Sequence, residues 1–234
     1  MDFDRNTKFY VEFGEAKEIL ISVLAISFAF TIVYAGLGSL IHYPQSFFLF
    51  AGLAVVTVGS GFILHEMAHK VVAIYYGAYA RFQMWLYGLL FMFVTSIFGF
   101  LFAAPGAVYI YSNTITKKEN GLISLVGPVV NVFVAIIFLF LESIRPVTFF
   151  FPFFRGALHV WDFGAQINIV LALFNMLPMF PLDGSKVFAW NKLVWGAFVL
   201  FSLAFGYFIF GSISIIFMWV ILLVITLIFS RALF

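Results

Sequence analysis

Two histidines and a glutamate, His65, Glu66 and His69, form an HExxH pattern inside an apolar stretch that covers residues 46–77. On a helix the two histidines are one turn apart and project from the same face, so both imidazoles can bind one metal ion. Glu66 lies next to the open coordination position, where a carboxylate can accept a proton from a metal-bound water. Zinc is the metal that this pattern favours. The sequence therefore predicts metal-assisted hydrolysis within a membrane.

A purely structural role explains these three residues poorly. An uncompensated His or Glu costs about 1–3 kcal/mol or more to insert into a membrane-spanning helix. Three such groups within five residues of an apolar stretch therefore indicate a functional site.

Asp183 is the best candidate for a third ligand, because zinc with two protein ligands would be under-coordinated. It follows Pro178 and Pro181, which end the preceding helix, and it precedes Gly184, which lets the backbone bend sharply. Acidic groups near a membrane interior are costly unless they are paired or metal-bound. The alternative is an ordinary turn in which Asp183 caps the next helix. Taken alone, that alternative is equally good; beside the histidine pair it is the weaker one.

Asparagines within the predicted spans are open to two interpretations. Asn131 ends the sequence Gly-Pro-Val-Val-Asn, and Asn168 and Asn175 lie on a later apolar stretch. A buried amide can stabilise an oxyanion, or it can join two helices by a hydrogen bond, and spacing alone favours the second role. His42 and His159 lie at segment edges without partners at ligand spacing, so we expect both to be interfacial or solvated.

Composition identifies an integral, multi-pass membrane protein, expected in the cell membrane. The chain has 234 residues, of which 65% are hydrophobic and 9% are charged. The formal net charge of +2 gives no indication of a nucleic-acid partner. Cysteine is absent, which excludes disulfides, thiolate ligands and a cysteine nucleophile. Apolar stretches long enough to cross a membrane cover residues 19–41, 46–76, 84–104, 122–141, 157–177 and 193–229.

The fold class that these stretches predict is an all-α polytopic membrane protein with about six transmembrane helices, the last stretch being divided near Gly211. We expect residues 1–18 to be a charged lead-in that is interfacial or solvated, and residues 19–234 to form one transmembrane domain. Within it, the catalytic core covers about 46–187 and the C-terminal spans about 193–230.

The segment 82–113 allows two structures, a re-entrant or β-hairpin element or a plain transmembrane helix. Turn residues and β-branched and aromatic residues favour the first, and length allows the second. His65, His69 and Asp183 can meet only if the ends of their spans face the same side of the membrane. The metal-site hypothesis therefore favours an even number of crossings, or none, between Arg81 and Lys117.

Three motifs in this order, HEMAH, GPVVN and NMLPMFPLDG, resemble the site-2 protease family of intramembrane zinc metalloproteases. The resemblance covers residues 46–187. It implies that His65, His69 and Asp183 bind one zinc ion per chain, that Glu66 is the catalytic base, and that Asn131 assists substrate or oxyanion binding. It also implies that the substrate is a transmembrane segment of another protein, cleaved in contact with membrane lipids.

Two other classes of protein are alternatives. The first is a zinc-binding membrane protein or transporter without peptidase activity. Transport would predict ionisable residues along a path and an internal repeat, whereas here they concentrate at one place. The second is a structural membrane scaffold, which leaves the His-Glu-His cluster unexplained.

Overall fold

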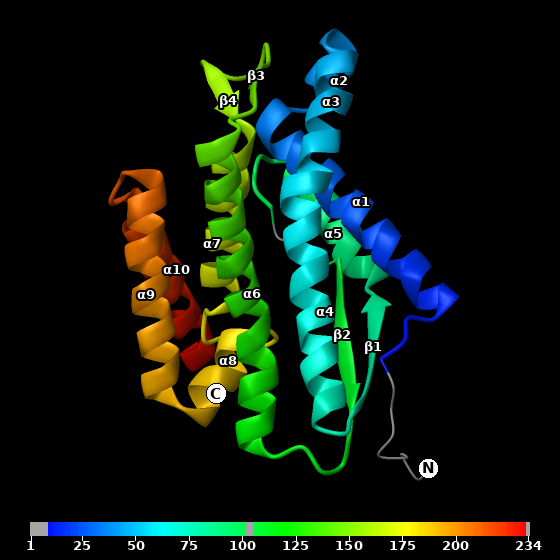
Figure 1. The fold of residues 1–234 in the computed structure, drawn as a ribbon, viewed down its shortest axis with the longest axis vertical. Helices are drawn as coiled ribbons and strands as arrows, with labels where there is room; N and C mark the ends of the chain where they lie inside the picture. The colour runs from blue at the N-terminus through cyan, green and yellow to red at the C-terminus, as the bar shows by residue number, and fades with distance from the viewer. Residues whose placement is uncertain (1–8, 102–104, 233–234) are drawn as a thin grey trace.

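The computed structural model describes residues 9–101 and 105–232 (Figure 1). Of the predicted lead-in, Asp2, Asp4, Arg5 and Lys8 lie outside the described residues. The helices and strands follow in the order α1 (Phe13–Ala35), α2 (Ser39–His42), α3 (Pro44–Ala54), the π-helical turn η1 (Val55–Gly59), α4 (Ser60–Tyr75), β1 (Tyr79–Met84), α5 (Leu86–Ile97), β2 (Gly106–Tyr111), α6 (Lys117–Ile144), β3 (Thr148–Phe150), β4 (Ala157–His159), α7 (Val160–Asn175), α8 (Asp183–Trp190), α9 (Lys192–Phe210) and α10 (Ser214–Ala232).

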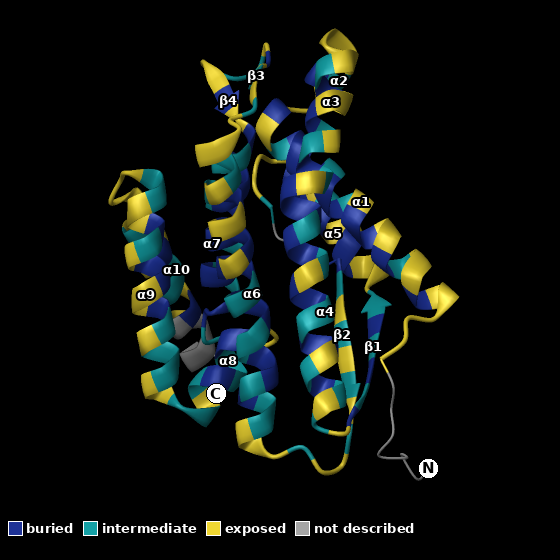
Figure 2. Cartoon of the chain, in the orientation of Figure 1, coloured by how far each residue is buried: buried dark blue, intermediate teal, exposed yellow. Residues whose placement is uncertain are grey.

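Four helices among the described residues are long and apolar enough to cross a membrane: α1, the continuous helix Pro44–Tyr75 that contains α3, η1 and α4, α6, and α9. Two shorter helical segments are also apolar, α5 and the part Ser214–Thr226 of α10. Figure 2 shows exposed residues along the outward faces of the helices, and many of these are large apolar side chains such as Phe133, Phe140 and Phe208. The chain is thus an all-α, multi-pass membrane protein, as predicted.

The bundle has two halves, each with a large hydrophobic cluster. One cluster joins α1, the α3–α4 helix and the β1–β2 segment, the other joins α6, α9 and α10, and α7 contributes to both. Helices α4 and α6 lie side by side where the two halves meet (Figure 1). Within the bilayer helices associate mainly through close packing. Polar side chains at the junction of α4 and α6 are therefore shielded from lipid on both sides.

Helix ends follow local sequence signals. Pro44 begins α3 at a position where its missing N–H is not needed. Thr116 and Glu119 form a capping box at the start of α6. Gly211, in the left-handed conformation with φ of 58°, ends α9 and separates it from α10. The predicted division of the last apolar stretch near Gly211 is therefore confirmed.

The segment 82–113 contains a β-hairpin with a helix inserted between its strands. Strands β1 and β2 pair antiparallel, from Tyr79 opposite Tyr111 to Met84 opposite Gly106, and α5 lies between them. The chain therefore leaves one end of the bundle and returns to that end (Figure 1). Of the two predicted structures the β-hairpin is the one observed, and its two ends lie at the same end of the bundle, the arrangement that the metal-site hypothesis favoured.

Glu15, in the predicted lead-in of residues 1–18, forms a buried ion pair with Lys70. Glu15 lies inside α1 with 1% of its surface exposed, and Lys70 of α4 is 2% exposed. Lys70 Nζ lies 2.6 Å from both carboxylate oxygens of Glu15, and the backbone N–H of Phe82 donates to Oε1 at 2.9 Å. Within the segment that we predicted to be interfacial or solvated, Glu15 is instead buried, because its carboxylate lies beside a cation and a strand N–H within the bundle. Together the pair ties α1, α4 and β1.

Removing one member of this pair is expected to destabilise the protein strongly. Lys70→Ala leaves the Glu15 carboxylate buried without its cation, which should lower the free energy of unfolding by about 3–5 kcal/mol. Thermal unfolding in detergent measures the effect. The matched control is Lys17→Ala, which removes a lysine from an exposed position on α1 and should change stability by about 0.5 kcal/mol or less. Equal stability of the two variants would contradict the structural importance of the pair.

Candidate metal centre

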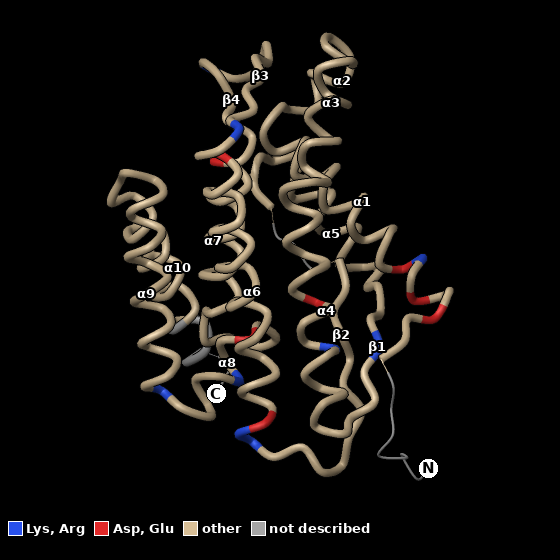
Figure 3. Tube along the Cα trace, in the orientation of Figure 1, with Lys and Arg blue, Asp and Glu red and all other residues tan. Residues whose placement is uncertain are grey.

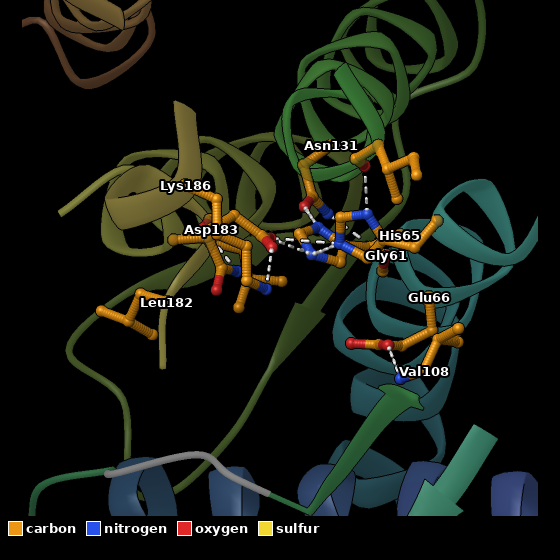
Figure 4. A network of polar contacts seen from close by, with 12 residues as sticks. Gly61, His65, Glu66, Val108, Asn131, Leu182, Asp183 and Lys186 are labelled. Carbon is orange, nitrogen blue, oxygen red and sulfur yellow. Dashed lines mark hydrogen bonds and ion pairs between the residues drawn. The ribbon is translucent and has the colours of Figure 1, made fainter. Parts of the chain in front are cut away.

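His65 and His69 of α4 and Asp183 at the start of α8 converge on one point. Figure 4 shows the side chains of His65 and Asp183 pointing toward each other. The Nε2 atoms of the two imidazoles are 3.0 Å apart, and Asp183 Oδ2 lies 3.2 Å from His65 Nε2 and 3.1 Å from His69 Nε2. All three residues are buried. Helix periodicity places the two histidines on the α4 face that meets α6 and α8, so two segments more than 100 residues apart supply the cluster.

The outer nitrogens of both imidazoles carry protons. Nδ1 of His65 lies 2.6 Å from Oδ1 of Asn131, and Nδ1 of His69 lies 2.6 Å from the carbonyl oxygen of Ile123. Both partners accept hydrogen bonds, so each Nδ1–H must donate. In a neutral imidazole the Nε2 atom then presents a lone pair. With neutral imidazoles the cluster brings three electron-pair donors together, an arrangement that suits a bound cation.

A zinc ion fits these donors. Ligand atoms placed 2.0–2.2 Å from a tetrahedral zinc are about 3.3 Å apart, close to the three separations in the cluster. Nitrogen and carboxylate oxygen are both zinc ligands, and zinc-binding histidines usually donate their other N–H to an acceptor, as His65 and His69 do here. The residues present therefore suit zinc in donor type, spacing and orientation.

Asp183 is held at the cluster by the turn before α8. Burial raises the pKa of its carboxyl, but the two imidazoles beside it have the larger combined effect and hold that pKa below its usual range. Lys186 Nζ lies 3.6 Å from the other oxygen, Oδ1. Gly184 has a different role from the one we expected. It lies within α8, where a Cβ would come 2.2 Å from the carbonyl oxygen of Met176, so it permits a close approach of two backbone segments.

Gly127 of α6 makes room for both imidazoles. A Cβ at this position would lie 2.6 Å from ring atoms of His65 and of His69. The glycine at the start of the GPVVN motif therefore sets how closely α6 can approach the two histidines.

Glu66 lies on the side of α4 that faces strand β2 (Figure 4). Its side chain is buried, and Oε2 accepts a hydrogen bond of 2.8 Å from the backbone N–H of Val108. Beside Glu66 and the histidines is a cavity of about 390 Å³, lined in part by residues 105–110 of the β2 segment and 180–183 of the turn before α8. A carboxylate next to the candidate metal ligands and facing a cavity is placed to exchange protons with a water held there.

The amides differ in their surroundings. Asn131 is fully buried, and its Nδ2 donates to the Gly61 carbonyl and to Oδ1 of Asn168. Asn175 lines the cavity, and its Nδ2 donates to the Leu171 carbonyl one turn earlier. Asn131 thus joins helices, as its spacing favoured, and it also contacts a metal-ligand candidate.

Other histidines lie away from the cluster. His42 is exposed at the end of α2. His159, which immediately precedes α7, is also exposed, and its Nδ1 lies 2.9 Å from Oε1 of Glu142, near the end of α6. Figure 3 shows that, of the charged residues drawn, more lie toward the end of the bundle that contains α8 than toward the β3–β4 end.

Three contacts of the site were not found from the sequence. They are the carbonyl of Ile123, the N–H of Val108 and the amide of Asn168. Backbone groups carry no residue-type signal, so the first two could not be recognised. Asn168 was noticed as polar, but its partner Asn131 lies on another helix.

A bundle of apolar helices with a buried cluster of two histidines and a carboxylate is typical of a membrane metalloprotease, and the chain is similar to proteins of that class. The model of peptidase family M50 matches residues 152–197, which include Asp183. A protein of Methanocaldococcus jannaschii named "putative zinc metalloprotease" is 43% identical over 184 residues, covering 77% of this chain and 86% of the relative. A protein of Bacillus subtilis with the same description is 29% identical over 161 residues, covering 63% of this chain and 71% of the relative. No solved structure matches the chain significantly.

The chain belongs to peptidase family M50, the zinc metalloproteases. The resemblance to site-2 proteases is thereby confirmed, and so is the prediction of an enzyme of the metalloprotease class.

Proposed function

We propose that this protein is an intramembrane protease that cleaves peptide bonds within transmembrane segments of other membrane proteins. The observation that carries the proposal is the burial of His65, Glu66 and His69 on a helix apolar enough to span the membrane, together with Asp183 and beside a cavity. A soluble peptide would have no need of a site placed in such a helix. A transmembrane substrate reaches it from the lipid.

The proposed roles follow from the geometry. His65, His69 and Asp183 would hold the zinc ion. When bound, zinc supplies Lewis acidity, which activates a water and polarises a peptide carbonyl. Glu66 would accept the proton of that water and later deliver it to the leaving amine. Asn131 uses both N–H groups within the protein, so we assign it first to orienting His65; the oxyanion role would require it to give up one of these bonds.

The edge of β2 suits an extended substrate. The N–H of Val108 points away from β1, and alternate residues of a strand direct their backbone groups to the same side. Gly106 and Ile110 therefore share this orientation, and all three line the cavity. A helical substrate hides its peptide carbonyls in its own hydrogen bonds, so it must unwind before attack. Pairing with the β2 edge would offset part of that cost.

For the topology we propose six crossings, made by α1, the α3–α4 helix, α6, α7, α9 and α10. Consecutive members of this series run in opposite directions in Figure 1, and the β1–β2 segment enters and leaves at one end. Helix α7 has 16 residues and lies between α6 and α9, so its ends need not reach lipid. The metal cluster would then lie near the end of the bundle that carries Arg81, Lys117, Lys118, Lys186 and Lys192.

Metal analysis and a cleavage assay test this function together. We expect about one zinc per purified chain, cleavage of a membrane-spanning reporter in lipid vesicles, loss of cleavage after chelation and recovery on adding zinc. Asp183→Ala removes one of three protein ligands, so bound zinc should fall well below one per chain and cleavage should be lost. Asp162→Ala, a carboxylate outside the cluster, is the control and should retain both.

Two results would contradict the proposal. A zinc-loaded protein that leaves every membrane-spanning reporter intact but moves zinc into vesicles would favour the transporter alternative. Full zinc occupancy in Asp183→Ala would remove Asp183 from the ligand set.

A further inference from the structure

Asn168 of α7 is joined to the metal-ligand candidate His65 through Asn131. Asn168 is fully buried, and its Oδ1 accepts a hydrogen bond of 3.0 Å from Asn131 Nδ2. Its own Nδ2 donates to the carbonyls of Gly164, at 2.9 Å, and of Thr57, at 3.2 Å, the latter in the π-helical turn η1. Three helical segments that are separate in the sequence therefore converge on one amide.

These contacts fix which way each amide points. The Nδ2 of Asn168 faces two carbonyls, which accept hydrogen bonds, so its Oδ1 must face Asn131. The Nδ2 of Asn131 in turn faces two acceptors, Asn168 Oδ1 and the Gly61 carbonyl, so its Oδ1 must face His65. Nδ1 of His65 then carries the proton, and Nε2 offers its lone pair to the metal cluster.

We propose that Asn168 is a positioning residue for the metal site, which acts through Asn131 to hold His65 in the tautomer that can bind metal. If Asn131 rotated by half a turn, its N–H groups would face Nδ1 of His65, and the imidazole proton would move to Nε2. That N–H would point into the cluster and block coordination. This inference rests on the proposed zinc site, but it concerns a residue outside the ligand set.

A substitution at Gly61 tests the contact between Asn168 and Asn131 without replacing either asparagine. A Cβ at this position would lie 2.1 Å from Oδ1 of Asn168, so Gly61→Ala must displace the Asn168 amide without changing that residue. Alanine also favours a helix more than glycine does, so the variant has no intrinsic helix penalty. Gly52→Ala, on the same continuous helix, is the matched control, because a Cβ there meets no described atom within 4 Å.

The experiment measures zinc affinity by competition with a chelator in wild type, Asn168→Leu, Gly61→Ala and Gly52→Ala, with thermal unfolding of the metal-free proteins alongside. Loss of a residue that orients a metal ligand typically weakens metal binding about 10–100-fold. We expect this loss for Asn168→Leu and Gly61→Ala, and wild-type affinity for Gly52→Ala. Should Asn168→Leu fail to fold, Gly61→Ala decides the question.

A double-mutant cycle separates positioning from packing. In an Asn131→Leu background, Asn168→Leu should cause no further loss of zinc affinity, because the connection to His65 is already absent. Independent, multiplying losses in the double variant would overturn the proposal, as would wild-type zinc affinity in a folded Gly61→Ala. A wild-type protein that binds no zinc would instead overturn the proposed function, so the two failures are distinguishable.

Discussion

Glu66→Gln is expected to abolish peptide cleavage while leaving zinc bound. Glutamine cannot accept the proton of a water, and loss of a general base typically reduces the rate by about 10²–10⁴-fold. Its Oε1 can still accept the hydrogen bond from the Val108 N–H that Glu66 accepts now. The substitution therefore removes the chemistry with little change in structure. Cleavage of a membrane-spanning reporter and zinc content of the same sample provide the measurement.

The control for this variant is Glu142→Gln, the same chemical change at the far end of α6. Glu142 contacts exposed His159 and is remote from the cluster, so cleavage should stay within about two-fold of wild type. Retained cleavage in Glu66→Gln would refute its assignment as the base.

Gly127→Ala should be nearly as damaging, although it adds a single methyl group. A Cβ 2.6 Å from both imidazoles must push α6 away from α4 or rotate the rings. Overpacking of this kind costs about 1–3 kcal/mol, and a shift of 1 Å at reacting groups can cost about 10²-fold in rate. We expect both weaker zinc binding and at least this loss of cleavage.

Gly196→Ala on α9 provides the comparison, since a Cβ there meets no described atom within 4 Å. It should bind zinc and cleave as the wild type does. If Gly127→Ala matched it in both measurements, the close approach of α6 to the histidines would not matter for function.

The convergence of His65, His69 and Asp183 could be predicted from the sequence because the signals are strong. His65 and His69 are one helical turn apart in an apolar span. Inserting two such polar side chains into a membrane costs free energy, so a functional reason is expected. Asp183 was found because it follows two prolines at the end of a span. Periodicity and length also located most long helices, since the number of apolar residues needed to cross a membrane is fixed by bilayer thickness.

Contacts between segments that are distant in the chain could not be predicted from the sequence. We expected Glu15 to be interfacial or solvated because it lies in a segment rich in charged residues, and only the fold reveals Lys70 and the Phe82 N–H beside it. The segment 82–113 remained ambiguous because the same β-branched and aromatic residues suit lipid and strands alike. Asn168 could not be connected to His65, since the link passes through Asn131 on a different helix.

The backbone N–H of Val108 donates a hydrogen bond to the Glu66 carboxylate. The same N–H cannot at the same time donate to a bound peptide. A peptide that added to β2 opposite Val108 would need this N–H for its own carbonyl, and one N–H makes one strong hydrogen bond. Binding of a peptide in that register would therefore break the hydrogen bond between the Glu66 carboxylate and Val108. Without substrate, Glu66 would stay hydrogen-bonded to Val108. A polypeptide that bound to β2 would free the Glu66 carboxylate to accept a proton.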